Sequence, residues 1–413
     1  MARDVLRPRN RVARAARVRP LLACGLLLSM SLALPLAHGG PARAVAAAPA
    51  PAPARADDDV AVEITPRVVA AVERGLDYLA SKQQRDGCWI GSVGFKLNQD
   101  YTVQESDVPH IGVTALCGMA FLAGGHLPDR GAYGVVLDRA VKFLIAHQND
   151  QGYITYRQSR MYDHAFATLF LAEVFGQTTS NEVRAALQKA VDLIKNSQNT
   201  RGSWRYQPFA LESDMSITVC QLMALRAARN VGIRVPAETI ERAVDYVLAS
   251  QVQEDPGWAG FHDVYEGGYY SLGKGAFRYQ YQDEDMSRSS FALTAAGITS
   301  LYHAARYDTS ILKSSLEFLQ EQQRRVSRPE WRTHYFYWYG HYYAAQAMFI
   351  TGGRWWESYW RSVSGELLET GTAFSQTADG AWPNPVGPGQ NFSTAVACIV
   401  LQVPNRYLPI LQR

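Results

Sequence analysis

Residues 198–204 read Gln-Asn-Thr-Arg-Gly-Ser-Trp and follow directly on an amphipathic segment at 181–198. The same spacing of glutamine, glycine and tryptophan recurs twice more, at Gln83, Gly87, Trp89 and at Gln376, Gly380, Trp382. Glycine adopts the left-handed backbone that ends many helices, and tryptophan offers a large ring for packing against a neighbouring unit. Three identical spacings in one chain therefore predict a repeated helical unit.

Weaker copies of this motif follow three other amphipathic segments. They are a degenerate copy at Gln148, Gly152, Tyr153, a stretched copy at Gln251, Gly257, Trp258, and Gln322, which has no glycine in register. With these copies the chain contains six repeats, so a single large repeat domain is expected.

One amphipathic segment occurs in every repeat, at 66–83, 134–148, 181–198, 236–251, 309–323 and 356–370. In the third segment Val183, Leu187 and Val191 recur at helical spacing, while Glu182 and Lys189 occupy the opposite face. A helix of this kind buries one stripe of its surface. We therefore expect these six helices on the outside of the domain.

Each amphipathic segment is followed by a second one that is apolar on nearly every side, at 109–123, 163–175, 214–229, 288–305, 340–351 and 391–402. A helix that is apolar all round must be surrounded by protein. The alternation predicts an outer and an inner layer, and six such hairpins close naturally into a double ring. We therefore expect residues 57–413 to form an all-α domain, an α6/α6 toroid.

The glutamine–tryptophan motif resembles the repeats of the squalene cyclase and protein prenyltransferase superfamily, over about residues 66–413. The resemblance implies a toroid, but the motif is a packing device and implies little about chemistry.

Terpene cyclases of this superfamily protonate their substrate with a D-x-D-D motif. The match here is Asp283-Glu284-Asp285-Met286, in which the last aspartate is replaced. By resemblance Asp285 would be the catalytic acid, with Asp283 beside it. The zinc-binding Asp-x-Cys pair of the prenyltransferases does not occur on any of the inner segments.

The first 56 residues are typical of an export signal followed by a spacer rich in alanine and proline. Seven arginines precede an apolar run of 16 residues at 21–36, which is short for a membrane span. We therefore expect export to the periplasm or the extracellular space without a stable membrane anchor; an uncleaved anchor is the alternative. This segment has nine arginines and one acid, so the rest of the chain has a net charge of about −5 although the whole has +3. A nucleic-acid partner is not expected.

One position in the first turn of each inner segment is polar. Counted four residues before a common landmark, it holds His110, His164, Asp214, Ser290, His341 and Gln390. Because repeats superpose by rotation, these side chains are expected to form a ring at one mouth of the toroid. Imidazole and carboxylate groups bind divalent metals, so His110, His164 and Asp214 form a candidate metal site. Acid–base catalysis, with His164 as a candidate, is a second interpretation, and helix capping is a third.

Aromatic residues are concentrated late in the chain, and Trp338 and Tyr342 on an inner segment are candidate ligand contacts. Insertions at 89–108 and 257–285 both precede inner segments and are expected at the polar mouth. The function we predict is an exported toroid that binds a hydrophobic small molecule, a glycan or a peptide at that mouth. The alternatives are a terpene cyclase-like enzyme with Asp285 as its acid, and an acid–base or metal enzyme that acts on a glycan.

Overall fold

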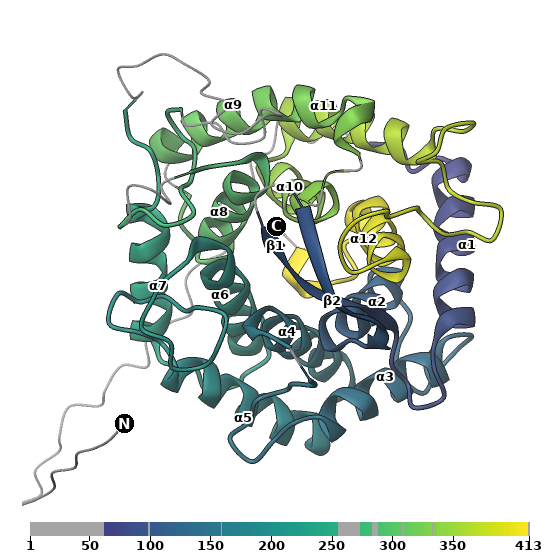
Figure 1. The fold of residues 1–413 in the computed structure, drawn as a ribbon, viewed down its shortest axis with the longest axis horizontal. Helices are drawn as coiled ribbons and strands as arrows, with labels where there is room; N and C mark the ends of the chain where they lie inside the picture. The colour runs from purple at the N-terminus through teal and green to yellow at the C-terminus, as the bar shows by residue number, and fades with distance from the viewer. Residues whose placement is uncertain are drawn as a thin grey trace, which may run out of the picture. The chain divides into compact units, whose positions relative to one another are not determined.

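A computed structural model describes residues 62–97, 100–157, 159–254, 273–282, 288–307, 309–332, 334 and 336–411. Within these ranges the helices form two concentric rings (Figure 1). The outer ring consists of α1 (Pro66–Lys82), α3 (Gly134–Ala146), α5 (Asn181–Asn196), α7 (Ala237–Ala249), α9 (Thr309–Val326) and α11 (Gly353–Leu368). The inner ring consists of α2 (Ile111–Ala123), α4 (Met161–Thr178), α6 (Met215–Asn230), α8 (Phe291–His303), α10 (Phe336–Thr351) and α12 (Gln390–Gln402).

The inner ring is closed. Each inner helix contacts the next in chain order, and α12 contacts α2. The outer helix α1 packs against α12, so the two ends of the chain's repeats meet. The predicted all-α toroid of residues 57–413 is thus confirmed over the described residues, and the helix bounds fall close to those predicted.

The polarity of the helices accounts for the two layers. In α5, Val183, Leu187, Val191 and Ile194 are buried, and Ser180 caps the first turn by accepting a hydrogen bond from the Val183 N–H at 3.4 Å. Every residue of α2 is buried. A helix buried on all sides has no face left for solvent, which fixes it in the inner ring.

The repeated motif ties adjacent outer helices together. Gln198 Nε2 donates to the carbonyl oxygen of Gly202 in its own turn, at 3.0 Å, and to that of Thr239 in the next outer helix, at 2.9 Å. Gly202 has φ of +80°, and a Cβ there would lie 2.2 Å from the Arg242 carbonyl oxygen. Only glycine fits both constraints. The expected helix-ending role of this glycine is wrong, because α5 ends at Asn196 and the glycine lies in the following turn.

The fourth copy of the motif is divided by its insertion. Gln251 donates to the Ile311 carbonyl oxygen of the next outer helix, at 3.0 Å. The glycine with positive φ is Gly275, whose Cβ would meet Ser314, and the buried aromatic residue two positions later is Phe277. Gly275 and Phe277 therefore occupy the positions that the sequence assigned to Gly257 and Trp258, which lie outside the described residues.

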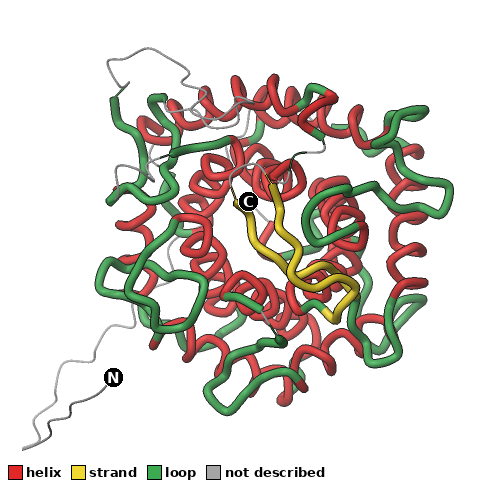
Figure 2. The backbone as a smooth tube through the Cα atoms, viewed as in Figure 1, coloured by secondary structure: helices red, strands yellow, loops and turns green. Residues whose placement is uncertain are grey.

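A hairpin covers one face of the ring. Strands β1 (Ile90–Leu97) and β2 (Asp100–Pro109) pair antiparallel with irregular register between Gly91 and Gly94 (Figure 2). The expectation of an insertion at 89–108 on the mouth is correct, and among the described residues this insertion forms the two-stranded sheet of an otherwise helical fold. The strands leave from Trp89 and return to His110, whose N–H donates to the Trp89 carbonyl oxygen at 3.1 Å.

The chain ends in short 3₁₀ turns, η2 (Val403–Asn405) and η3 (Pro409–Leu411), which follow α12 and pack with buried Leu408 and Ile410. A further turn, η1 (Pro329–Trp331), follows α9. The expected signal segment and spacer at 1–56 lie outside the described residues. Among the helices that the structure does describe, none combines the length and the apolar character needed to cross a bilayer.

Candidate functional site

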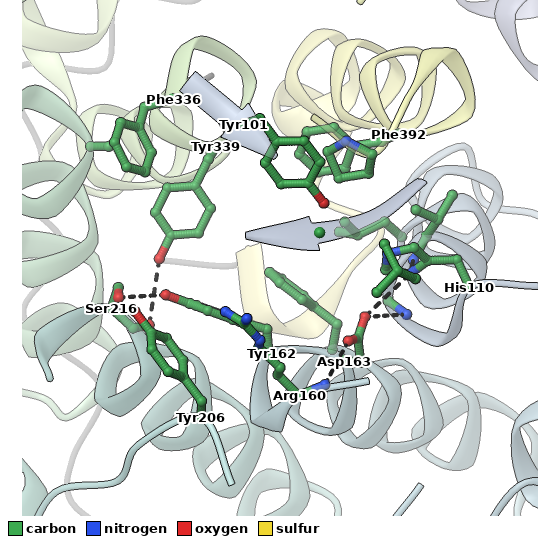
Figure 3. Close-up of a pocket in the computed structure, with 18 of the residues that line it drawn as sticks. Tyr101, His110, Arg160, Tyr162, Asp163, Tyr206, Ser216, Phe336, Tyr339 and Phe392 are labelled. Carbon is green, nitrogen blue, oxygen red and sulfur yellow. Dashed lines mark hydrogen bonds and ion pairs between the residues drawn. The ribbon is translucent and has the colours of Figure 1, made fainter. Parts of the chain in front are cut away.

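A cavity of about 340 Å³ opens where the hairpin meets the first turns of the inner helices (Figure 3). Its wall combines aromatic rings with polar groups. The aromatic members are Tyr101, Tyr162, Phe166, Tyr206, Tyr279, Phe336, Tyr339 and Phe392, and the ionisable polar members are His110, Arg160, Asp163 and Arg288. The size is within the range of small-molecule sites.

One side of the cavity contains a histidine–aspartate pair. His110 is the N-cap of α2, and its Nδ1 lies 3.2 Å from Asp163 Oδ1 in the first turn of α4. The same Oδ1 accepts the Gly112 N–H at 2.9 Å, and Oδ2 accepts the Arg160 N–H at 3.1 Å. The carboxylate is therefore held by groups from two adjacent inner helices.

These contacts also set the charge of Asp163. Burial alone would raise its pKa, but the His110 ring and the N–H groups of Arg160 and Gly112 outweigh burial, so the pKa lies below its usual value. Asp163 is thus ionised at neutral pH, and its negative charge faces the imidazole.

The opposite side contains a chain of hydroxyl groups that ends on a buried carboxylate. Asp214, the fully buried N-cap of α6, accepts from Ile217 N–H and Ser216 Oγ, each at 2.8 Å. Ser216 Oγ lies 2.5 Å from the Tyr162 hydroxyl. Since Ser216 donates to the carboxylate, its oxygen accepts from Tyr162, which orients that phenol.

A second branch of this network reaches two more tyrosines. Tyr279 donates to Asp214 Oδ2 at 3.3 Å, and its hydroxyl lies 2.5 Å from that of Tyr206. Arg205 Nη1 also lies 3.3 Å from Asp214 Oδ2. Burial raises the pKa of Asp214, while the donors around it oppose that rise. All of its contacts are donors, as an ionised carboxylate requires.

Two arginines lie against the aromatic wall. The Arg160 guanidinium is 4.7 Å from the centre of the Tyr206 ring, and that of Arg288 is 5.5 Å from the centre of the Tyr279 ring. Distances of this size are typical of cation–π contacts. The arginines thus hold the tyrosine faces in place and add donors to the wall.

The structure brings only part of the predicted polar ring to the cavity. His110 and Ser290 line it, and Asp214 lies behind its wall. His164 is fully buried and points to the outer helix α5, with its Nε2 3.2 Å from the Ala190 carbonyl oxygen. His341 points to α11, with its Nδ1 2.9 Å from the Tyr359 hydroxyl. The prediction that His110, His164, Asp214 and His341 share one mouth is therefore wrong for His164 and His341.

Helix length explains this difference. The aligned position is the N-cap in α2, α6 and α8. The side chains of Asp214 and Ser290 accept hydrogen bonds from the first turn, and His110 Nδ1 lies 3.4 Å from the Val113 nitrogen. Helix α4 begins at Met161 and α10 at Phe336, so His164 and His341 lie inside their helices. A side chain inside a helix projects differently from a cap. Burial lowers the pKa of His164 to about 4, so it is neutral and unsuited to the catalytic role predicted for it.

The metal site predicted from His110, His164 and Asp214 is not assembled. Within the described ranges, no three side chains of histidine, cysteine, aspartate or glutamate lie close enough together to hold a metal ion. The predicted contacts Trp338 and Tyr342 are buried elsewhere, and Phe336 and Tyr339 of the same helix line the cavity instead. Asp283 and Asp285 lie outside the described residues.

The sequence prediction missed Asp163, Tyr162, Tyr206 and Tyr279. A signal for two of them exists, since Tyr206 and Tyr279 each stand two positions after the buried aromatic residue of their repeat. Their carbonyl oxygens accept the N–H groups of Met161 and Met215, each at 2.9 Å, which places them beside the starts of α4 and α6. Asp163 has the weaker signal of an acid in the first turn of a helix.

Comparison with known proteins places this geometry in a known fold. Residues 161–349 match the family of the squalene-hopene cyclase C-terminal domain. A type II terpene cyclase from Scytonema, in complex with geranylgeranyl dihydroxybenzoate, is 14% identical and superposes with a TM-score of 0.52 over 83% of this chain and 98% of that one. The chain thus has the α/α toroid fold and resembles the squalene cyclases over residues 161–349. No curated protein matches it.

Toroids that act on sugars are similar in structure as well. An inactive variant of an α-1,6-mannanase from Salegentibacter sp., in complex with α-1,6-mannotriose, is 8% identical with a TM-score of 0.56, over 81% of this chain and 98% of that one. The cellobiose 2-epimerase of Spirochaeta thermophila is 12% identical with a TM-score of 0.55, over 83% and 98%. At these identities the likeness establishes the toroid fold and leaves the activity to the site.

Proposed function

We propose that this toroid is an exported protein that binds a saccharide in the cavity at its mouth. The observation that carries the proposal is the mixed wall, in which flat aromatic rings alternate with hydroxyl, guanidinium and imidazole groups. A sugar presents apolar C–H faces and a rim of hydroxyls, so it needs both kinds of partner at once.

The orientation of the wall groups supports a polar ligand. The Asp214 network, through Ser216, directs the Tyr162 hydroxyl proton inward to the protein, so the Tyr162 oxygen remains as an acceptor. Arginine side chains supply donors beside it. Structurally similar toroids include a mannanase in complex with a mannotriose, so a toroid of this fold can hold a saccharide.

Isothermal titration calorimetry with a panel of reducing disaccharides tests the proposal. We expect Tyr339→Ala, which removes a ring from the wall, to weaken binding by about tenfold or more. Tyr307→Ala, at a tyrosine that is 45% exposed and does not line the cavity, is the matched control and should bind as the wild type does. Absence of binding to every disaccharide would overturn the proposal.

A second candidate is a terpene cyclase-like enzyme with Asp285 as its acid. It is favoured by the family match over residues 161–349 and by the position of Arg288, three residues after Asp285, in the cavity wall. Conversion of squalene by the wild type, lost in Asp285→Asn, would favour this candidate over the saccharide site.

A further inference from the structure

His110 has one ring nitrogen engaged and the other open. Its Nδ1 lies 3.2 Å from Asp163 Oδ1 and 3.4 Å from the Val113 nitrogen. Nδ1 cannot both accept from the Val113 N–H and donate to Asp163. Because the carboxylate is the closer partner and can only accept, we assign the proton to Nδ1, and the longer contact with Val113 is then not a hydrogen bond. Within the described part of the chain Nε2 makes no hydrogen bond, and the ring lines the cavity. The basic lone pair of the neutral imidazole is therefore on Nε2.

Asp163 is held more firmly than the histidine it contacts. Two N–H groups, those of Gly112 in α2 and Arg160 before α4, fix its two oxygens. A Cβ on Gly112 would lie 2.3 Å from Asp163 Oδ1, so glycine is required for this approach. An ionised carboxylate behind an imidazole fixes its tautomer and stabilises the imidazolium that forms when Nε2 takes a proton.

Asp163 is placed to support the histidine rather than to act as one of a pair of catalytic carboxyl groups. Glycosidases generally use two carboxyl groups on either side of the scissile bond. Among the described residues of the wall, Asp163 is the one carboxylate, and both of its oxygens already accept hydrogen bonds. A single histidine base is instead suited to moving a proton on the ligand.

We propose that His110 is a catalytic base and Asp163 its positioning residue, so that the cavity transfers a proton on a bound reducing sugar. The inference rests on the saccharide binding proposed above. In the open-chain sugar, the hydrogen on the carbon beside the carbonyl passes as a proton to Nε2. The electron pair of that C–H bond forms the double bond of an enediolate, while the carbonyl pair moves to oxygen. The proton then returns to carbon from the imidazolium, so the step is balanced without another reactant.

Deuterium exchange on the full chain tests this step. Each disaccharide that binds by calorimetry is incubated with protein in D₂O, and loss of the proton signal at C2 of the reducing unit is followed by NMR. We expect exchange with the wild type and a loss of about 100-fold or more in His110→Gln, both measured at a saturating sugar concentration so that weaker binding cannot account for the loss. His147→Gln is the matched control, since His147 lies at the end of α3 with its Nδ1 2.8 Å from the Phe143 carbonyl oxygen.

The outcomes separate this inference from the proposed function. Binding without exchange in the wild type, or exchange that survives in His110→Gln, would overturn the catalytic base and leave saccharide binding in place. Failure of every disaccharide to bind would overturn both.

The tautomer of His110 and the rate of exchange together test the role of Asp163. Nitrogen-15 NMR should show His110 protonated at Nδ1 in the wild type and a mixture of tautomers in Asp163→Asn, together with slower exchange. If Asp163→Asn does not fold, Asp163→Glu retains the charge but displaces it, and slower exchange is again expected. An unchanged tautomer and unchanged exchange would show that Asp163 does not position the base.

Discussion

Glu173 is a single residue whose ionisation the fold opposes. It lies in the inner helix α4 and is 2% exposed, and its Oε2 has no hydrogen-bond partner among the described residues. The Ile410 N–H near the chain's end donates to it, which only partly offsets desolvation. Burial raises the pKa of Glu173 to about 8. The group is therefore neutral in the folded protein over most of the physiological range.

This shift predicts a pH-dependent stability. In the unfolded chain Glu173 titrates near its ordinary value of 4.5, and in the folded chain near 8. Its neutral form is thus favoured by folding, so its contribution is fully present below pH 4.5 and is lost as the pH rises towards 8. Across that window we expect wild-type stability to fall relative to Glu173→Gln, by up to about 1.4 kcal/mol per pH unit. Urea unfolding at several pH values measures this difference.

The matched control is Glu182→Gln on the exposed face of α5. Its stability should run parallel to that of the wild type over the same pH range. If Glu173→Gln also ran parallel to the wild type, the carboxyl would be ionised in the folded state and the argument from burial would be wrong.

The residues of the site were only partly predictable from sequence. His110 was found because it shares a repeat position with other polar residues, and the same alignment wrongly selected His164 over its neighbour Asp163. Alignment assumes that every inner helix begins at the same point, whereas α4 begins four residues earlier than α2 relative to the common threonine. The start of a helix depends on tertiary contacts, such as the bond from the Met161 N–H to the Tyr206 carbonyl oxygen, which no local pattern reveals.

At the scale of the element, outer helices are joined by turns that contain the glutamine–glycine–tryptophan motif, and the same motif predicted the repeats. Periodicity predicts the helices well because each repeats its apolar stripe over several turns. It did not predict the hairpin of β1 and β2, whose glycines at 91 and 94 interrupt a regular alternation. The pairing of those strands is set by their position between Trp89 and His110 rather than by a local signal.

The tryptophan of the motif should contribute strongly to the stability of the packing between neighbouring repeats. Trp204 is 1% exposed, and its Nε1 donates to the Ile194 carbonyl oxygen at 2.8 Å. Trp204→Ala leaves a large cavity and removes one of the two side-chain donors to that carbonyl, so we expect a loss of about 3–5 kcal/mol in the free energy of unfolding. Chemical denaturation measures it, with Phe209→Ala as the control because Phe209 is 56% exposed. Equal effects of the two changes would contradict the packing role.

At the scale of the whole molecule, closure distinguishes this repeat protein from an open array. In an open array each repeat contacts only its neighbours in sequence, and the ends are free. Here Gln376 Nε2 donates to the Ala71 carbonyl oxygen of α1 at 2.8 Å, so the turn after α11 holds the first outer helix as Gln198 and Gln251 hold the helices that follow them. The inner ring therefore has no free end among the described repeats, and opening it at any point exposes two ends.

The contact between α1 and α12, which closes the ring, can test this idea because Gly75 of α1 lies in it. A Cβ on Gly75 would lie 2.6 Å from Cys398 Sγ and 2.9 Å from Cζ3 of Trp382. Gly75→Leu should therefore force α1 away from α12, at a cost of about 1–3 kcal/mol from overpacking. We further expect α1 to become the first segment cut by a protease, since its release leaves the other contacts between repeats intact. Gly365→Leu in α11 is the matched control, because a Cβ there meets no atom within 4 Å. Similar stability and similar cleavage patterns for the two variants would mean that the ring does not depend on this contact for its closure.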